Sequence, residues 1–405
     1  MPLSVVIAGG GTGGHLYPGI AVAREVLRRV PDARVSFAGT ARGLEARVVP
    51  REGFDLDLIR SAGLKGKAIS ARLRGAALVP VSMLDAWRIL SRRRPDVVLG
   101  VGGYSSFPVV FTAALRRIPT MLLEQNAAPG LSNRMLAPWV RAAAVTYQQT
   151  VSFFGRRGFV TGNPVRAEFF QTSNFELPTS NFRRVLVLGG SQGAHAINMA
   201  MVAAAPRLVS RGTPVEVVHQ TGERDLSRVR EAYEHAGIPA RAEAFFDAVA
   251  SEITAADVVV CRAGATTLAE LAAAGKPAVL IPFPAATDDH QRKNARVLAD
   301  AGAAVLVEER SLTPEGLADE IAGTLADPAR RAAMSAAMRT FARPDAAARI
   351  VAARLRKYGR VPLQEVFRMR GFAVKRFPKW ETEQMPKDEI ARLERELRDE
   401  GILGQ

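Results

Sequence analysis

Cysteine is nearly absent from this chain. Cys261 is the only cysteine among 405 residues, so no intramolecular disulfide can form and a reducing compartment is expected. No uninterrupted apolar run reaches the roughly 18 residues of a membrane span, and no low-complexity tract occurs. The short apolar start, residues 2–8, lacks the basic flank of a signal peptide. We therefore expect a protein of the cytoplasm or of the cytoplasmic face of a membrane.

Acidic residues are also in short supply. The chain has 40 of them against 55 lysines and arginines, which gives a formal net charge of +15. This surplus suits nucleic acid, anionic lipid, a phosphate-bearing substrate or simply a solvated basic surface. Between Arg60 and Arg94, nine basic residues and one acid surround the apolar segment 76–84. That combination favours docking on an anionic membrane surface, which we place at residues 63–90.

The length and the alternation of apolar segments with helical patterns predict two α/β domains. Near-continuous apolar strands separated by helices indicate parallel sheets that are covered on both faces. A polar stretch at 166–181 predicts a linker between the halves. The expected strands are 4–8, 34–38, 55–59, 96–101, 120–124 and 142–146 in the first half, and 185–188, 215–219, 240–245, 258–261, 278–281 and 304–307 in the second. Helical patterns in the first half include 16–29, 78–93 and 107–116.

Two glycine-rich turns stand about 180 residues apart, Gly9-Gly-Gly-Thr-Gly-Gly-His15 and Gly189-Gly-Ser-Gln-Gly-Ala-His195. Each follows an apolar strand and leads into an expected helix. Bare backbone N–H groups and a helix N-terminus at such a turn suit an anionic or polyhydroxylated ligand. The two turns therefore predict two similar halves with a cleft between them, as in a nucleotide-sugar enzyme.

Three other kinds of site are excluded by what the motifs lack. Residues 9–14 match the dinucleotide fingerprint, but no acid ends the second strand to hold a ribose, so a nicotinamide site is rejected. Asp55 and Asp57 form a D-x-D pattern, but the strict alternation around them favours an edge strand, and we expect no metal site. Only three tryptophans and five tyrosines occur, without basic–aromatic interleaving, so no nucleic-acid partner is expected.

Several residues are candidates for chemistry. His15 opens a helix whose positive end would keep the imidazole neutral and able to act as a base, although a solvent-facing helix residue would look the same. Arg166 can reach a phosphate across the cleft or be a linker arginine. Gly264 would present a helix N-terminus to an anion. Glu270 would bind the paired hydroxyls of a ribose, or it is an ordinary glutamate on an exposed helix surface. Residues 282–295 carry the amide and hydroxyl groups that sugar recognition requires.

Taken in order, these motifs resemble the MurG family of peptidoglycan synthesis, in glycosyltransferase family 28. The resemblance covers about residues 4–345 and rests on segments 10–15, 100–104, 124–126, 162–166, 189–193, 220–222, 261–270 and 290–295. It implies the α/β GT-B fold, two Rossmann-like parallel-sheet domains facing a deep cleft. The expected bounds are 1–165 for an acceptor- and membrane-facing domain, 166–344 for a UDP-GlcNAc-binding domain, 345–360 for a helix crossing back, and 361–405 for a basic extension of unknown role.

The resemblance implies an inverting transfer of GlcNAc from UDP-GlcNAc to the MurNAc 4-hydroxyl of lipid I, giving lipid II without a cofactor. The implied base is His15, with Glu124 as the runner-up or as the group that orients the histidine. The implied substrate-binding residues are Thr12, Gly13, Gly14, Asn126, Arg166, Ser191, Phe246, Ala265, Thr266, Thr267, Leu268, Ala269, Glu270 and Gln291. A lipid acceptor also implies a peripheral position on the cytoplasmic face of the bacterial inner membrane.

Two features depart from the family pattern. Residues 245–247 read Phe-Phe-Asp where aliphatic residues are usual, and the tail beyond Tyr358, with a charged amphipathic helix expected at 387–400, has no counterpart. The strongest rivals are another lipid glycosyltransferase of this architecture and a UDP-GlcNAc 2-epimerase. Segments 100–104 and 124–126 favour an acceptor-facing first domain, which an epimerase would not need.

Overall fold

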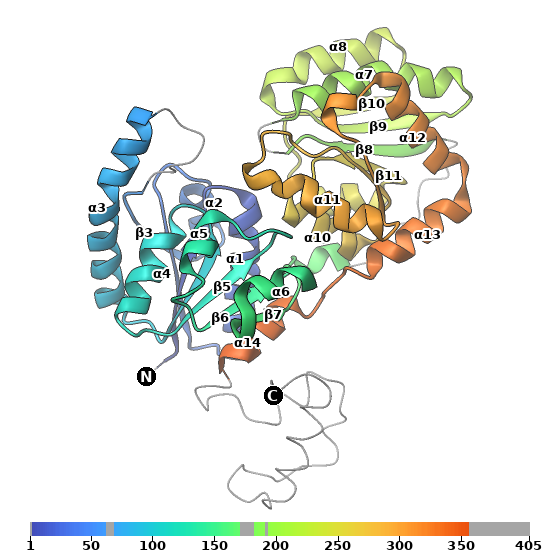
Figure 1. Ribbon diagram of the computed structural model, residues 1–405. Coiled ribbons are helices and arrows are strands. Elements are labelled where there is room, and N and C mark those ends of the chain that lie inside the picture. The colour runs from blue at the N-terminus through green and yellow to red at the C-terminus, as the bar shows by residue number, and fades with distance from the viewer. Residues whose placement is uncertain (1, 62–68, 171–181, 191–192, 356–405) are drawn as a thin grey trace, which may run out of the picture. The chain divides into compact units, whose positions relative to one another are not determined.

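The computed structural model describes residues 2–61, 69–170, 182–190 and 193–355, with side chains omitted for 69–77 and 354–355. Ser191, the extension 361–405 and most of the expected linker therefore lie outside the described residues. The chain divides into two compact units, residues 1–348 and 349–405. The first unit contains two separate parallel sheets (Figure 1).

The first sheet has seven strands in the order β3-β2-β1-β4-β5-β6-β7. Their bounds are β1 Ser4–Gly9, β2 Arg34–Gly39, β3 Asp55–Leu58, β4 Val97–Gly102, β5 Thr120–Glu124, β6 Ala142–Val145 and β7 Gly158–Val160. The helices of this half are α1 Gly13–Arg29, α2 Glu45–Arg51, α3 Ile69–Arg93, α4 Ser106–Leu115, α5 Leu131–Leu136 and α6 Gln148–Phe154, with the 3₁₀ turn η1 Gly155–Arg157. Valine, leucine and alanine fill the core against the sheet.

The second sheet has six strands in the order β10-β9-β8-β11-β12-β13. Their bounds are β8 Arg183–Leu188, β9 Val215–Gln220, β10 Ala240–Glu243, β11 Val258–Cys261, β12 Ala278–Leu280 and β13 Ala304–Leu306. The helices of this half are α7 His195–Ser210, α8 Leu226–His235, α9 Val249–Ala255, α10 Ala265–Ala274, α11 His290–Asp300, α12 Pro314–Ala326 and α13 Pro328–Arg339, with 3₁₀ turns η2 Ala167–Phe170, η3 Glu223–Asp225, η4 Thr287–Asp289 and η5 Glu309–Ser311. The last helix in the chain is α14 Ala346–Leu355.

Both sheets reverse their strand order at the same place. In the first sheet β1 lies between β2 and β4, and in the second β8 lies between β9 and β11. Ligands of open parallel sheets bind at such switch points, beyond the carboxyl ends of the strands. The two glycine turns follow β1 and β8, so each occupies the switch point of its own sheet.

The predicted fold class, two doubly wound parallel sheets, is confirmed, and each predicted strand is present. The structure adds β7 and starts α3 nine residues earlier than the expected helix at 78. The edge position predicted for the Asp55–Asp57 segment is also confirmed, because β3 ends the first sheet. A helix, α14, starts near 345 as expected, and its crossing back stays a prediction, as do the domain bounds.

The burial of β3 differs from what simple alternation suggests. Asp57 is buried, whereas Leu58 is 57% exposed. The Asp57 carboxylate accepts hydrogen bonds from the guanidinium groups of Arg92 and Arg93 at the end of α3. These ion pairs offset the cost of burying the acid, so the D-x-D pattern serves the packing of α3 on the sheet edge. Along the residues that the structure describes, no helix has the length and hydropathy of a membrane span.

Candidate active site

A cleft of about 1440 Å³ is lined by residues from both sheets of the first unit. Thirteen of the residues expected at the site line it: Thr12, Gly13, Gly14, His15, Glu124, Asn126, Arg166, Phe246, Ala265, Thr266, Thr267, Glu270 and Gln291. Leu268 packs into the core, and neither it nor Ala269 is among the lining residues. Ser191 lies outside the described residues.

The first glycine turn is packed backbone against backbone on the loop after β4. A Cβ atom at Gly103 would lie 2.5 Å from the carbonyl oxygen of Gly10, so only glycine fits there. A Cβ at Gly102 would likewise lie 2.8 Å from the Nδ1 atom of His15. The absence of side chains at these positions lets His15 sit against the β4 loop, in the wall of the cleft.

His15 has the properties of a base that is neutral near pH 7. Burial lowers its pKa from the usual 6.5, and this effect is opposed by the negative charge of Glu124. The backbone N–H of His15 donates to the carbonyl of Thr12 at 3.2 Å, which makes His15 part of the first turn of α1. The glycine turn therefore holds the backbone of His15, whereas the buried Nδ1 atom of the imidazole has no hydrogen-bond partner among the residues that the structure describes.

Glu124 ends β5 and is only 1% exposed. Its carboxylate accepts hydrogen bonds from the backbone and side chain of Asn126, at 3.0 and 3.1 Å, from Gly130 N at 3.0 Å and from Asn133 Nδ2 at 2.8 Å. These four donors occupy the carboxylate oxygens with protein groups and fix the side chain in place. This geometry favours the role of an orienting group for Asn126 and for the loop that follows.

The N-terminus of α10 forms the opposite wall of the cleft. Gly264 is the N-cap residue, and Ala265, Thr266 and Thr267 supply the first-turn amides that no carbonyl of the helix can pair. An anion at this point would receive both hydrogen bonds and the favourable end of the helix dipole. Leu268 donates its N–H to the carbonyl of Gly264, which is why its backbone is already engaged in the helix.

Arg166 and Glu270 lie beside this helix start. The guanidinium of Arg166 lies 5.1 Å from the ring centroids of both Tyr17 and Phe169, and it forms a 3.0 Å ion pair with Glu168. Burial raises the pKa of Glu270 to about 7, and the charge of Arg166 opposes this rise. Arg166 and Glu270 therefore place a cation and a carboxylate in the same wall of the cleft, and the carboxylate gains or loses its proton near pH 7.

Phe246 and Gln291 complete the second-half wall. Phe246 is 3% exposed, and its backbone N–H points to Gln220 Oε1 at 3.4 Å. Gln291 Oε1 accepts a 3.0 Å hydrogen bond from Phe283 N, which leaves its side-chain NH₂ available to a ligand. Gln291 can therefore offer its side-chain NH₂ group to a ligand, and Phe246 its backbone carbonyl.

Hydrogen bonds join the two halves across the cleft. Asn294 Oδ1 accepts from Ala127 N at 2.8 Å, and Asn294 Nδ2 donates to Asn126 Oδ1 at 3.1 Å. Thr266 Oγ1 donates to the carbonyl of Gly14 at 3.0 Å. The start of α10 and the histidine turn are therefore direct neighbours. Over the described residues, no cluster of three or more His, Cys, Asp or Glu side chains is placed to hold a metal ion.

Two family models match the chain, the N-terminal domain of glycosyltransferase family 28 over residues 5–145 and its C-terminal domain over residues 184–350. A transferase of Anaeromyxobacter sp. strain K is 49% identical over 351 residues, which cover 86% of this chain and 91% of the relative. The chain belongs to the MurG family. The curated name of that relative is UDP-N-acetylglucosamine--N-acetylmuramyl-(pentapeptide) pyrophosphoryl-undecaprenol N-acetylglucosamine transferase.

Other MurG relatives and structures agree with this assignment. A protein of the same name from Myxococcus xanthus is 45% identical over 346 residues, 85% of this chain and 90% of the relative. The crystal structure of Acinetobacter baumannii MurG has a TM-score of 0.71 at 29% identity, covering 87% of this chain and 99% of that one. A UDP-N-acetylglucosamine 2-epimerase, with a TM-score of 0.62 at 16% identity, shares the fold. The expected GT-B fold of the MurG family is confirmed.

Motif analysis did not assign every polar residue of this MurG-family cleft. Tyr104 and Gln220 line it, and both lie in motifs that were recognised without a role for these side chains. Glu45 and Asn294 do not line the cleft. They support its wall through hydrogen bonds to residues that are distant in the sequence, Glu45 to Gly11 and Asn294 to Ala127. Asn294 has a sequence signal, its place three residues after Gln291 on α11, whereas Glu45 has none.

Proposed function

We propose that the chain is an inverting glycosyltransferase that moves GlcNAc from UDP-GlcNAc to the MurNAc 4-hydroxyl of lipid I, giving lipid II. The observation that carries the proposal is the 3.0 Å hydrogen bond from Thr266 to Gly14, which joins an anion-binding helix start to the His15 turn. A leaving diphosphate and a base are needed within one sugar's width of each other. The names of the MurG relatives support the same donor and acceptor.

The donor would lie along the second-half wall. The free amides of Ala265, Thr266 and Thr267, together with Arg166 and Ser191, would hold the diphosphate. These groups can stabilise the charge that develops on UDP as it leaves, in place of a metal ion. Glu270 would accept hydrogen bonds from the ribose hydroxyls, and backbone groups at Phe246 would meet the uracil.

The sugar would lie between the halves. Asn126, whose side-chain Oδ1 is held by Asn294, and Gln291 would orient the GlcNAc hydroxyls. The segment 12–14 would close over the sugar from the first half. Both amide side chains are fixed by hydrogen bonds to protein, so they are oriented before the ligand arrives.

The chemical step needs one proton acceptor. The MurNAc 4-hydroxyl oxygen attacks the anomeric carbon of GlcNAc, its proton passes to the neutral imidazole of His15, and the bond from the anomeric carbon to UDP breaks with inversion. The lowered pKa of His15 keeps the imidazole unprotonated at neutral pH. Glu124 orients Asn126 and its loop, and its charge stabilises the imidazolium as it forms.

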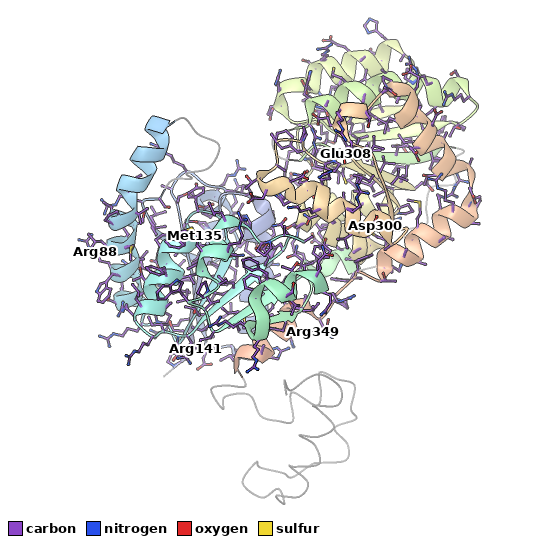
Figure 2. The ribbon with its side chains drawn as sticks, in the orientation of Figure 1. Arg88, Met135, Arg141, Asp300, Glu308 and Arg349 are labelled. Carbon is purple, nitrogen blue, oxygen red and sulfur yellow. The ribbon has the colours of Figure 1, made fainter. Side chains whose placement is uncertain are left out.

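We also propose that the first half docks on an anionic membrane surface through the segment 63–90, since the acceptor carries a polyprenyl chain. Residues 63–68 and the side chains of 69–77 lie outside the described part of the chain. Trp87 on α3 and Trp139 after α5 are 53% and 52% exposed. The guanidinium of Arg116 lies 4.6 Å from the Trp87 ring centroid, and Phe111 links to Trp139 edge to face. Arg88, the residue after Trp87, lies on the outer side of α3 (Figure 2). Exposed aromatics with arginines around them suit a headgroup region.

Transfer of labelled GlcNAc to a lipid I analogue, with and without excess EDTA, tests the proposed function. We expect a β-linked disaccharide lipid and turnover that survives chelation. If UDP-GlcNAc is epimerised or hydrolysed and no lipid product forms, the protein is a UDP-GlcNAc 2-epimerase with this fold and the proposed transferase function is wrong. Transfer to diacylglycerol in place of lipid I would replace only the acceptor.

A further inference from the structure

Glu45 is a buried carboxylate directly beneath the first glycine turn. It opens α2 and is 0% exposed, although it lies next to the cleft wall formed by Leu44. Its Oε2 atom accepts a 2.7 Å hydrogen bond from Gly11 N, and its Oε1 atom accepts from both the N–H and the hydroxyl of Thr40 at 2.9 Å. None of these contacts belongs to the chemistry proposed above.

The surroundings of Glu45 are shaped for its carboxylate. A Cβ atom at Gly10 would lie 2.5 Å from the carboxylate carbon, and side chains at Gly39 and Gly43 would also collide with Glu45. The chain therefore omits side chains at three positions around one acid. Burying a carboxylate is costly unless its oxygens are hydrogen-bonded, and here backbone amides and a hydroxyl supply the bonds.

A glycine turn with a free amide ordinarily presents that amide to an anionic ligand. Here the chain supplies the anion itself, because Gly11 N is bonded to Glu45. The next carbonyl, that of Thr12, accepts the N–H of His15 and so begins α1. Thr40 extends the contact to Tyr104 on the β4 loop, with 3.4 Å between the two hydroxyl oxygens. One carboxylate thus connects the carboxyl ends of β1, β2 and β4.

We propose that Glu45 is a positioning residue for the transfer reaction: as a built-in anionic ligand of the first glycine turn, it holds the backbone that presents His15 to the cleft. This inference rests on the proposed role of His15. Glu45 acts without touching substrate, and the UDP-binding wall in the second half does not depend on it.

Glu45→Gln tests the proposal, because the amide has the same shape but places an NH₂ group opposite one of two N–H donors. We expect kcat for transfer to a lipid I analogue to fall about tenfold or more while the Kd for UDP, measured by calorimetry, changes less than about threefold. Thr40→Val removes the hydroxyl contacts with Glu45 and Tyr104 but keeps the backbone N–H bond to Glu45, and it is expected to lower kcat about threefold. Glu25→Gln, which removes a carboxylate of α1 bonded to Arg28 and Arg29, is the control and keeps the wild-type kcat.

A double-mutant cycle separates positioning from general destabilisation. If Glu45 acts through His15, the variant with both Glu45→Gln and His15→Ala has the same kcat as His15→Ala alone. Additive losses, a wild-type kcat for Glu45→Gln, or equal losses of kcat and UDP affinity would each overturn the inference. If Glu45→Gln does not fold, the same cycle with Thr40→Val decides. Transfer that requires His15 but not Glu45 leaves the proposed function intact, whereas wild-type protein that makes no lipid product refutes the proposed function itself.

Discussion

The two glycine turns of this protein are alike in sequence and differ in how they are held. Both follow the strand at the switch point of a sheet, and both lead to a histidine at the start of a helix. In the first turn the nearby acid, Glu45, bonds to the backbone, and His15 faces the cleft. In the second the nearby acid, Asp225, bonds to the side chain of His195 at 3.0 Å, and His195 does not line the cleft.

The difference shows that a motif sets the path of the backbone, whereas a distant acid sets what the motif can do. With its amide at Gly11 occupied and its histidine facing the cleft, the first turn is suited to catalysis. With its histidine paired to Asp225, the second turn has no free imidazole for the cleft, and its backbone groups and Ser191 suit the proposed binding of a phosphate-bearing donor. In the proposed mechanism the first half supplies the base and the second half binds the donor, and substitutions can test this division.

The largest expected difference concerns the two histidines. His15→Ala should lower kcat at least about a hundredfold, because a general base contributes about 10²–10⁴ in rate. His195→Ala should lower kcat less than about threefold, since His195 lies outside the cleft wall. Steady-state transfer kinetics with both variants measure this, and UDP calorimetry confirms that each still binds donor. Equal losses of kcat in the two variants would show that the two histidines do not differ in role, and His15 would then not be the base.

A matched pair of glycines gives the next effect. A Cβ atom at Gly103 would lie 2.5 Å from Gly10 O, and one at Gly193 would lie 2.5 Å from Thr221 O. Both residues also have positive φ, 81° and 71°, which costs an alanine about 1–2 kcal/mol more. We expect Gly103→Ala to lower kcat and Gly193→Ala to weaken UDP-GlcNAc binding, each by about tenfold. If Gly103→Ala weakened UDP-GlcNAc binding and Gly193→Ala lowered kcat, the proposed division between a catalytic first half and a donor-binding second half would be wrong.

The pH dependence of the two halves should also differ. In the proposed donor site, ribose hydroxyls donate to an ionised Glu270, whose pKa burial raises to about 7, so UDP affinity should fall as pH decreases below 7. The limiting slope is about tenfold per pH unit for one proton. Catalysis by His15, whose pKa burial lowers from 6.5, should persist until lower pH, at saturating donor. Calorimetry with UDP between pH 6 and 8 measures the first effect, and Glu270→Gln should abolish its pH dependence.

The smallest expected effect concerns the outer surfaces. Trp87→Ala and Trp139→Ala in the first half should each reduce binding to vesicles that contain anionic lipid, by about three- to tenfold. Val209→Ala, an exposed apolar position on α7 of the second half, should leave that binding unchanged. Co-sedimentation at two salt concentrations measures both, and a Val209→Ala loss as large as the tryptophan losses would show that the surface is not specific to the first half.

Local patterns in the sequence predicted the strands, the order of motifs and both glycine turns, because apolar runs and glycine positions are local signals. The partners of the turns could not be predicted in this way. Glu45 reaches Gly11 only after β2 folds against β1, and Asp225 reaches His195 across a neighbouring strand end. Likewise, alternation in β3 did not reveal that Asp57 would be the buried residue, since its arginine partners come from the far end of α3.

Three of the bonds that join the halves share one property. Thr266 bonds to the carbonyl of Gly14, Asn294 to the N–H of Ala127, and Asn163 Nδ2 to the carbonyl of Ala265. In each case one half contributes a side chain and the other only main chain, which every sequence provides. These three bonds constrain only one half each, whereas the Asn126–Asn294 and Arg134–Asp288 side-chain pairs constrain both. A chimera of halves from different relatives would therefore need to retain the threonine, the asparagines and both members of these two pairs to bring a new donor specificity to an old acceptor.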